Sequence, residues 1–232
     1  MAPRKSMNNV YNQGVKMDLV TTSSEVSQRV GLAFLKEAYF LHAEYRVKLF
    51  LKTLNSEIEY MGSEEQRKFN EYLEKAETKK VLADYASAIT STSSDIGLRA
   101  LALTFINDRQ FDFSDNEKVR FISCISGLDD LKVNLFIRLA SLDTLDSKAV
   151  YPIYSVSNGE FDTLKLPVDV DELFAYCEDF FNRGLLLRDP RETGAFNFYV
   201  PKDGDWSICF GISDTLKKFA SVLRKAKELT SK

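Results

Sequence analysis

Histidine is almost absent from the 232-residue sequence, which contains His42 alone. Zinc sites and catalytic triads draw on several His, Cys, Ser or Asp side chains, so any such site would depend on this one residue. His42 falls on a predicted helix in line with Ala38 and Arg46, where we expect it to be structural or exposed. No glycine-rich phosphate loop is present. We therefore predict no catalytic residue, no metal ligand, no cofactor and no small-molecule substrate, and hence a protein that is not an enzyme.

Carboxylate pairs leave one other route to catalysis, at Asp129-Asp130 and in "DGD" at 203–205. The first pair suits the start of a helix and the second a tight turn. Neither has the spaced ligand pattern of a dedicated cation site. Both are interpreted as structural.

Cysteines and long apolar runs are also scarce. Cys124, Cys177 and Cys209 are odd in number, far apart and flanked by apolar residues, as expected of buried thiols in a reducing compartment. No apolar run approaches the ~20 residues that cross a bilayer, and no apolar segment follows the basic residues at the N-terminus as a secretory signal requires. We predict a cytoplasmic protein with no membrane partner, in which residues 1–21 form a flexible basic arm.

Apolar residues recur with a helical period after "TSSE" at 22–25, which fits a capping box. One apolar row consists of Val30, Phe34, Ala38, Leu41, Tyr45 and Leu49. A second row on another face consists of Leu35, Tyr39, Phe50, Leu54, Ile58 and Met61. A helix that is apolar on two faces is wrapped by neighbours or by another chain, and unbroken to Met61 it would span about 55 Å. We therefore predict an association helix that contacts a protein partner or a second copy through Phe34, Leu41, Tyr45 and Leu49.

Further helices are indicated as far as residue 141. Capping boxes are predicted at 63–66 and at 114–117, and Asp129 or Asp130 begins another helix. "TSTSSD" at 90–95 separates two helical segments. The sequence pattern then changes, because Asn158-Gly159 between two β-rich runs predicts a hairpin over 150–166.

The last third mixes strands with helices. Asp169 introduces an amphipathic helix that Gly184 ends, strands at 185–189 and 195–200 are expected to pair across a turn at 190–194, and Asp203-Gly204 suits a further hairpin turn before 206–212. A helix from Ser213 closes the chain, and we expect it to bury Leu216, Phe219, Val222 and Leu223. The predicted fold is mainly α with a small α+β C-terminal part: a helical domain at 22–147, followed by an α+β domain at 148–232 that extends back to the helices at 114–142 in one alternative.

The order helix 169–183, "GLL" at 184–186, a two-stranded wing and the closing helix "SDTLKKFASVL" resembles the winged-helix superfamily. That resemblance implies a winged-helix-like module. The hairpin at 150–166 departs from it, because the family usually places its first strand earlier. In architecture the chain also resembles accessory subunits of coiled-coil ATPase complexes and bacterial phage-exclusion proteins.

Charge decides how such a module is used. A DNA-reading helix needs Lys and Arg against phosphates, whereas the helix at 169–183 is acidic, so Asp171 and Glu172 are predicted to contact a protein partner. The net charge of −3 and the pI near 5.4 supply no overall cationic field. Weak, electrostatic nucleic-acid contact is expected at the basic last helix, together with Arg4, Lys5 and Lys16 of the N-terminal arm. In that helix the residues are Lys217, Lys218, Arg224, Lys225 and Lys227. The same cations also suit the negative end of a helix dipole.

Trp206 has Phe196, Phe198 and Phe210 within strand reach, and we expect it to pack across the wing. Together these features predict a non-catalytic protein-interaction or adaptor subunit of a larger intracellular assembly. Anti-phage defence and chromosome or plasmid handling are the settings that the architecture suggests. The alternative is a winged-helix DNA-binding regulator that dimerises through the long N-terminal helix.

Overall fold

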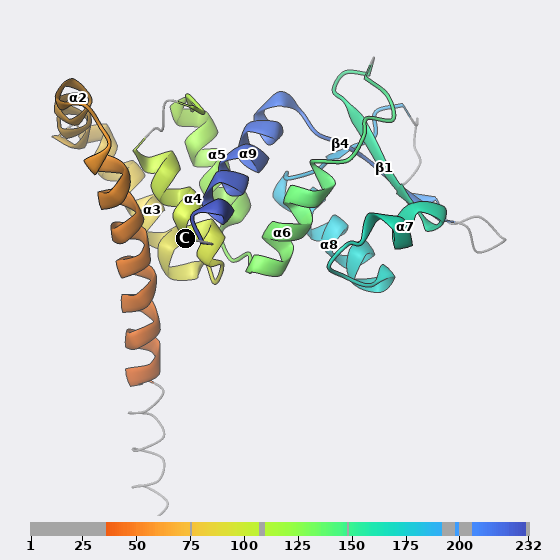
Figure 1. The fold of residues 1–232 in the computed structure, drawn as a ribbon, viewed down its shortest axis with the longest axis horizontal. Coiled ribbons are helices and arrows are strands. Elements are labelled where there is room, and N and C mark those ends of the chain that lie inside the picture. The colour runs from red at the N-terminus through yellow and green to blue at the C-terminus, as the bar shows by residue number, and fades with distance from the viewer. Residues whose placement is uncertain are drawn as a thin grey trace, which may run out of the picture. The chain divides into compact units, whose positions relative to one another are not determined.

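The computed structural model describes residues 36–74, 76–106, 110–147, 149–191, 198–199 and 206–230. The chain divides into two compact units, Met1–Tyr45 and Arg46–Lys232. Most described residues are helical, and a small antiparallel sheet lies in the C-terminal part (Figure 1). The predicted fold class, mainly α with a small α+β part, is confirmed. The predicted boundary at 147/148 falls inside the second unit, and the arm at 1–21 and the capping box at 22–25 lie outside the described residues.

The N-terminal helix covers residues 36–59, and a turn at Tyr60 ends it close to the predicted Met61. Leu49, Phe50, Thr53 and Leu54 are buried, as one stripe of a helix that packs on a core should be. The Phe50 ring lies 6.4 Å from that of Tyr85. Phe50 and Leu54 of the second apolar row, together with Leu49 of the first, therefore face the core of the second unit.

Helices α2 (Ser63–Glu74) and α3 (Ala76–Ser91) follow. The capping box predicted at 63–66 is wrong by one residue, because the Glu65 carboxylate accepts from the backbone N–H of Gly62 at 2.7 Å and Ser63 already belongs to the helix. None of the described residues of α2 is buried. Its ion pairs, such as Arg67 with Glu64 and Glu71, are exposed and contribute little to stability.

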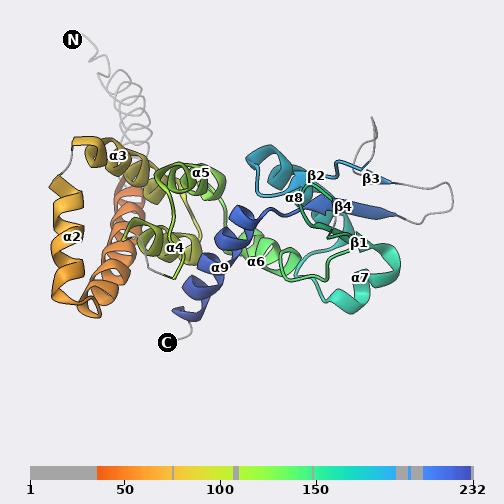
Figure 2. The ribbon, with the colours of Figure 1, turned by 90° about the horizontal axis from the view of Figure 1, so that it is seen from above.

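Three capped helices form the middle of the second unit: α4 (Asp95–Phe105), α5 (Asp115–Ile125) and α6 (Asp130–Leu139). Ser114 and Glu117 make the predicted capping box at the start of α5, and Asp129 caps α6 through the N–H of Lys132. Almost every residue of α4 is buried. The closing helix α9 (Asp214–Glu228) packs along α4, so the C-terminal part of the chain completes the helical core (Figure 2).

The sheet is built around β4 (Ser207–Gly211). β1 (Ile153–Ser157) pairs with it along one edge, from Ile153 opposite Gly211 to Ser157 opposite Ser207. Along the other edge, β2 (Leu187–Arg188) pairs with residues 210–211 and β3 (Phe198–Tyr199) with residues 207–208. The expected pairing of β2 with β3 is wrong, because both pair with β4. The turns predicted at 190–194 and at 203–204 fall mostly or wholly outside the described residues.

The predicted hairpin at 150–166 is also wrong. Residues Asn158–Leu164 form helix α7, and β1 finds its partner in β4 instead of in the segment that follows it. The backbone N–H of Asn158 donates to the carbonyl of Trp206, and the Ser157 hydroxyl donates to the Glu160 carboxylate at 3.0 Å. The chain thus enters a helix at the point where a two-residue turn was expected.

Helix α8 (Val170–Arg183) has the predicted bounds. Asp169 and Glu172 form a capping box at its start, and Gly184 ends it with φ +72°, a left-handed conformation that favours glycine. Leu173, Cys177 and Phe180 are buried. In α9, the residues predicted to be buried, Leu216, Phe219, Val222 and Leu223, all are.

Candidate interaction site

The residues predicted to form an interface on the N-terminal helix have different environments. Leu41 and Tyr45 are 60% and 49% exposed. Leu49 is 8% exposed and belongs to the core, so it offers no surface to a partner. Phe34 lies outside the described residues.

Other apolar side chains of this helix are exposed beside Leu41 and Tyr45. They are Tyr39, Phe40, Val47 and Leu51, of which Leu51 is 45% exposed. Sequence reasoning assigned Tyr39 to the second apolar row and did not single out the other three. Exposed apolar residues that follow one another along a single helix are a common mark of a contact surface.

The acidic residues of α8 serve the fold in several places. Glu172 accepts from the backbone N–H of Asp169 at 3.2 Å in the capping box, and Glu178 lies 3.6 Å from Arg188. Asp171 is exposed in the first turn. Of the two acidic residues predicted to contact a partner, Glu172 has a structural role and Asp171 lies at the surface.

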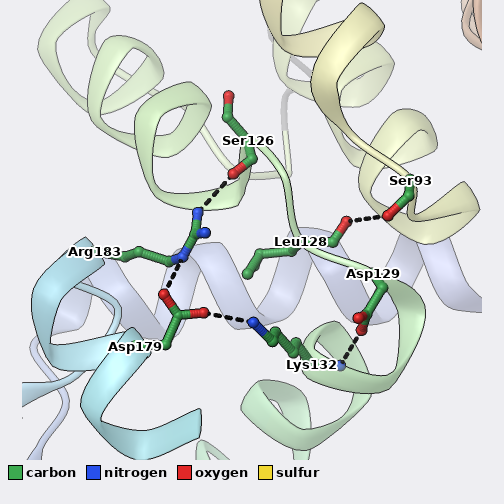
Figure 3. Close-up of polar contacts among 7 residues, drawn as sticks. All are labelled: Ser93, Ser126, Leu128, Asp129, Lys132, Asp179 and Arg183. Atoms are coloured by element: carbon green, nitrogen blue, oxygen red, sulfur yellow. Dashed lines mark hydrogen bonds and ion pairs between the residues drawn. The ribbon is translucent and has the colours of Figure 1, made fainter. Parts of the chain in front are cut away.

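Asp179, in the last turns of α8, is the centre of a polar cluster that joins three helices (Figure 3). Its two carboxylate oxygens accept from Lys132 Nζ on α6 and from Arg183 Nε, each at 2.8 Å. Arg183 Nη1 also donates to the carbonyl of Ser126 at 2.6 Å, just after α5. We call Asp179, Lys132, Arg183 and the Ser126 carbonyl the Asp179 cluster. Partial burial alone would raise the pKa of Asp179, but the hydrogen bonds and charges of Lys132 and Arg183 outweigh it and lower that pKa.

The loop between α5 and α6 is held from the other side by the start of α4. The Ser93 hydroxyl donates to the carbonyl of Leu128 at 3.3 Å, and the Asp130 carboxylate accepts from the Ser94 hydroxyl and from the N–H of Ile96 (Figure 3 shows the first contact). Asp129 and Asp130 are therefore structural, as the sequence indicated.

The thiols behave as predicted for two of the three cysteines. Cys124 and Cys177 are buried and Cys209 is half-buried, and none of these three described residues forms a disulfide. Burial raises the pKa of Cys177 to about 12 and also raises that of Cys124. Neither thiol has the lowered pKa of a nucleophilic cysteine.

The basic residues of α9 lie close to acidic side chains or hydroxyl groups. Lys218 contacts Glu117 at 3.3 Å, Lys225 lies 3.7 Å from Glu57, and Arg224 donates to the Ser141 hydroxyl. Lys217 lies 3.9 Å from Asp214, and Lys227 is exposed. The patch proposed for nucleic acid thus has acidic groups within it.

Trp206 packs against two helices, and its predicted contacts with Phe196 and Phe198 fall on side chains outside the described part of the chain. Its ring lies 5.7 Å from Phe161 of α7 and 5.3 Å from Phe174 of α8, both edge-on. It anchors these two helices against the start of β4.

His42 is exposed, and no group of three or more His, Cys, Asp or Glu suited to a metal ion occurs among the described residues. Nor is any helix in this part of the chain long and apolar enough to cross a membrane.

One feature that sequence reasoning missed is a cavity of about 500 Å³. We call it the Lys118 cavity; its lining includes Glu57, Met61, Phe69, Tyr72, Phe105 and Lys118. Lys118 occupies the apolar stripe of α5 together with Phe121, Ile122 and Ile125. A lysine at such a position is the signal that would have indicated the site.

Comparison with known proteins gives no match: no protein-family model fits the sequence, and neither a curated protein nor a solved structure is similar to it.

Proposed function

We propose that this chain is a non-catalytic protein-interaction subunit of a larger assembly, and that exposed apolar residues of the N-terminal helix belong to its contact surface. The exposure of Leu41, Tyr45, Val47 and Leu51 along one helix carries this proposal. Burying such side chains in an interface contributes roughly 25 cal/mol for each Å² removed from water. Leaving them in water gives no comparable gain.

The partner that fits this surface is a second copy of the chain. In the sequence, Leu41, Glu44, Lys48 and Leu51 are separated by three, four and three residues, which is the spacing of residues that share a helix–helix contact. The series is symmetric about position 46. When two such helices run antiparallel and cross at that position, Leu41 meets Leu51 of the other copy, and Glu44 meets Lys48.

Charge reversal tests this arrangement directly. We expect Glu44→Lys and Lys48→Glu each to weaken self-association of the full chain, because each places like charges opposite one another, by roughly 0.5–1 kcal/mol per contact. The double variant Glu44→Lys with Lys48→Glu should restore it. Sedimentation velocity over a range of concentrations measures the association, and circular dichroism checks the fold.

Leu51→Glu is the stronger disruption, since it puts a charge at the apolar contact, and Asn70→Glu, at an exposed position of α2, is its control for added charge. A wild-type chain that stays monomeric at all concentrations would overturn the self-association. Affinity purification with the wild type and with Leu51→Glu, followed by mass spectrometry and binding of the purified candidate, would then decide whether another protein occupies this surface.

We also propose that the C-terminal part is a winged-helix-like module used for protein contact. The helical α7 supports this reading, because β1 then precedes both α7 and α8, and the strand order β1-β4-β2 places β1 beside the last strand. The acidic groups on α8 and those close to the lysines of α9 disfavour the alternative of a DNA-binding regulator. Mobility-shift assays at two salt concentrations test this, since sequence-selective binding at physiological salt would favour the regulator.

A further inference from the structure

The Lys118 cavity lies entirely within the second compact unit. Its walls come from the last turn of the N-terminal helix, α2, the end of α4, the start of α5 and the end of α9; these elements can be followed in Figure 2. The volume of about 500 Å³ is within the roughly 300–1,000 Å³ typical of small-molecule sites. The cavity is thus large enough for a ligand of one or two rings.

The lysine in this cavity is buried with incomplete compensation for its charge. The Lys118 side chain is only 6% exposed, and Nζ lies 3.6 Å from the Asp115 carboxylate, beyond the usual range of a hydrogen bond. Its other partner is the face of the Tyr72 ring, 5.1 Å from Nζ to the centroid. An ammonium group has three N–H donors, and none of the described residues accepts a hydrogen bond from it. An anionic group in the cavity would supply the missing acceptor.

The rest of the wall suits an apolar or aromatic molecule. Phe69 packs edge-on against Phe105 at 5.8 Å, and Met61 lies on the same lining. Behind Phe105, at 5.0 Å, is the ring of Tyr85, whose hydroxyl is buried and has no hydrogen-bond partner among the described residues. Tyr85 lies outside the lining, so the cavity combines an aromatic wall with the under-satisfied ammonium group of Lys118.

The carboxylates on the lining are already engaged. Glu57 lies 3.7 Å from Lys225, and Glu65 accepts from the Gly62 N–H at 2.7 Å. A cationic ligand would find both acids partnered and would be repelled by Lys118, whereas an anionic ligand meets the ammonium group that lacks a hydrogen-bond acceptor.

We propose that the Lys118 cavity binds a small organic anion with an aromatic or apolar body. The carboxylate or sulfonate accepts hydrogen bonds from Lys118 Nζ, and the body packs against Phe69 and Tyr72. The lining of this site does not include Leu41, Tyr45, Val47 or Leu51. Its test therefore does not depend on the proposed function.

A pair of matched compounds tests both halves of the site. In ¹H–¹⁵N NMR titrations of the full chain, 1-naphthalenesulfonate should bind in a saturable manner and shift amides at 57–72 and 105–118. The neutral 1-naphthalenesulfonamide should bind at least roughly tenfold more weakly, since it cannot form charge-assisted hydrogen bonds. Lys118→Met should weaken the sulfonate by a similar factor and leave the sulfonamide unchanged.

Lys217→Met is the matched control, because it removes the same charge from α9 outside the cavity. It should leave both affinities unchanged. Three results would each overturn the proposal: no saturable binding of the sulfonate, equal affinity of the two compounds for the wild type, or shifts confined to residues outside 57–72 and 105–118. If Lys118→Met failed to fold, the difference between the two compounds on the wild type and the location of the shifts would still decide the matter.

Discussion

Asp179 and Lys118 are both charged side chains held largely below the surface, and their surroundings differ in one respect. Asp179 receives two hydrogen bonds of 2.8 Å from Lys132 and Arg183. Lys118 has one carboxylate at 3.6 Å and a ring face. A buried charge with a full set of hydrogen-bond partners holds the helices that supply those partners together. A buried charge that lacks partners can bind a ligand of opposite charge.

The largest effect is expected from breaking the Asp179 cluster. Asp179→Asn should lower the free energy of unfolding by about 2 kcal/mol, since it leaves the charges of Lys132 and Arg183 half-buried without their anion. Chemical denaturation measures this. Asp171→Asn, exposed on the same helix, should stay within about 0.5 kcal/mol of the wild type. Equal effects of the two variants would show that the cluster adds nothing beyond surface charge.

Lowering the pH should gradually remove the stabilisation that the Asp179 cluster provides. The pKa of Asp179 is lowered in the folded state, so its contribution is fully present above the unfolded value of about 3.9 and is lost as the pH falls through the lower folded value. The difference in unfolding free energy between the wild type and Asp179→Asn should therefore narrow from pH 6 to pH 3. A difference that stays constant over that range would contradict the lowered pKa.

Substitution of two glycines by alanine tests the backbone conformation at the end of α8. Gly184 directly follows Arg183 of the Asp179 cluster, and Gly159 lies in α7. Gly184→Ala should cost about 1 kcal/mol because φ is +72° there. Gly159→Ala, in α7, meets no atom within 4 Å and has no positive φ, so it should be neutral or stabilise the helix by up to about 1 kcal/mol. Thermal unfolding of the two variants measures the contrast. Equal melting temperatures would argue against the left-handed conformation at the end of α8.

The smallest effect is expected at Lys118. Lys118→Met keeps the aliphatic stem and removes a charge that lacks a hydrogen-bond acceptor, so stability should change by less than about 1 kcal/mol, towards the more stable side. Chemical denaturation of Lys118→Met and Asp179→Asn under the same conditions measures the two changes in unfolding free energy. A loss as large as that of Asp179→Asn would mean that Lys118 also has a structural role.

Local signals in the sequence were sufficient for the starts of α5, α6 and α8 and for the end of α8. Ser114 with Glu117, Asp129, and Asp169 with Glu172 mark helix starts that the structure confirms, and Gly184 marks an end. Each is a contact between residues a few positions apart, so the sequence contains the whole interaction. The buried residues of α9 were also predicted correctly, because the helical period of apolar residues is a local feature of the sequence.

Long-range pairing is where sequence reasoning failed. Asn158-Gly159 favours a hairpin locally, but β1 gains its full register from β4, more than 50 residues later. Ser157 and Glu160 also carry the spacing of a helix start, and that signal was the correct one. The exposed apolar residues of the N-terminal helix were predicted only in part, because their exposure depends on which of two apolar rows meets the core. The Lys118 cavity needs five separate segments to come together.

The position of Trp206 has a practical consequence. It is the single tryptophan of the sequence, wedged against Phe161 and Phe174. Its fluorescence emission therefore monitors only the end of the second unit that contains the sheet, while far-ultraviolet dichroism is dominated by the helices. Coincident melting curves from the two signals would identify the second unit as a single cooperative block, which the packing of α9 along α4 leads us to expect.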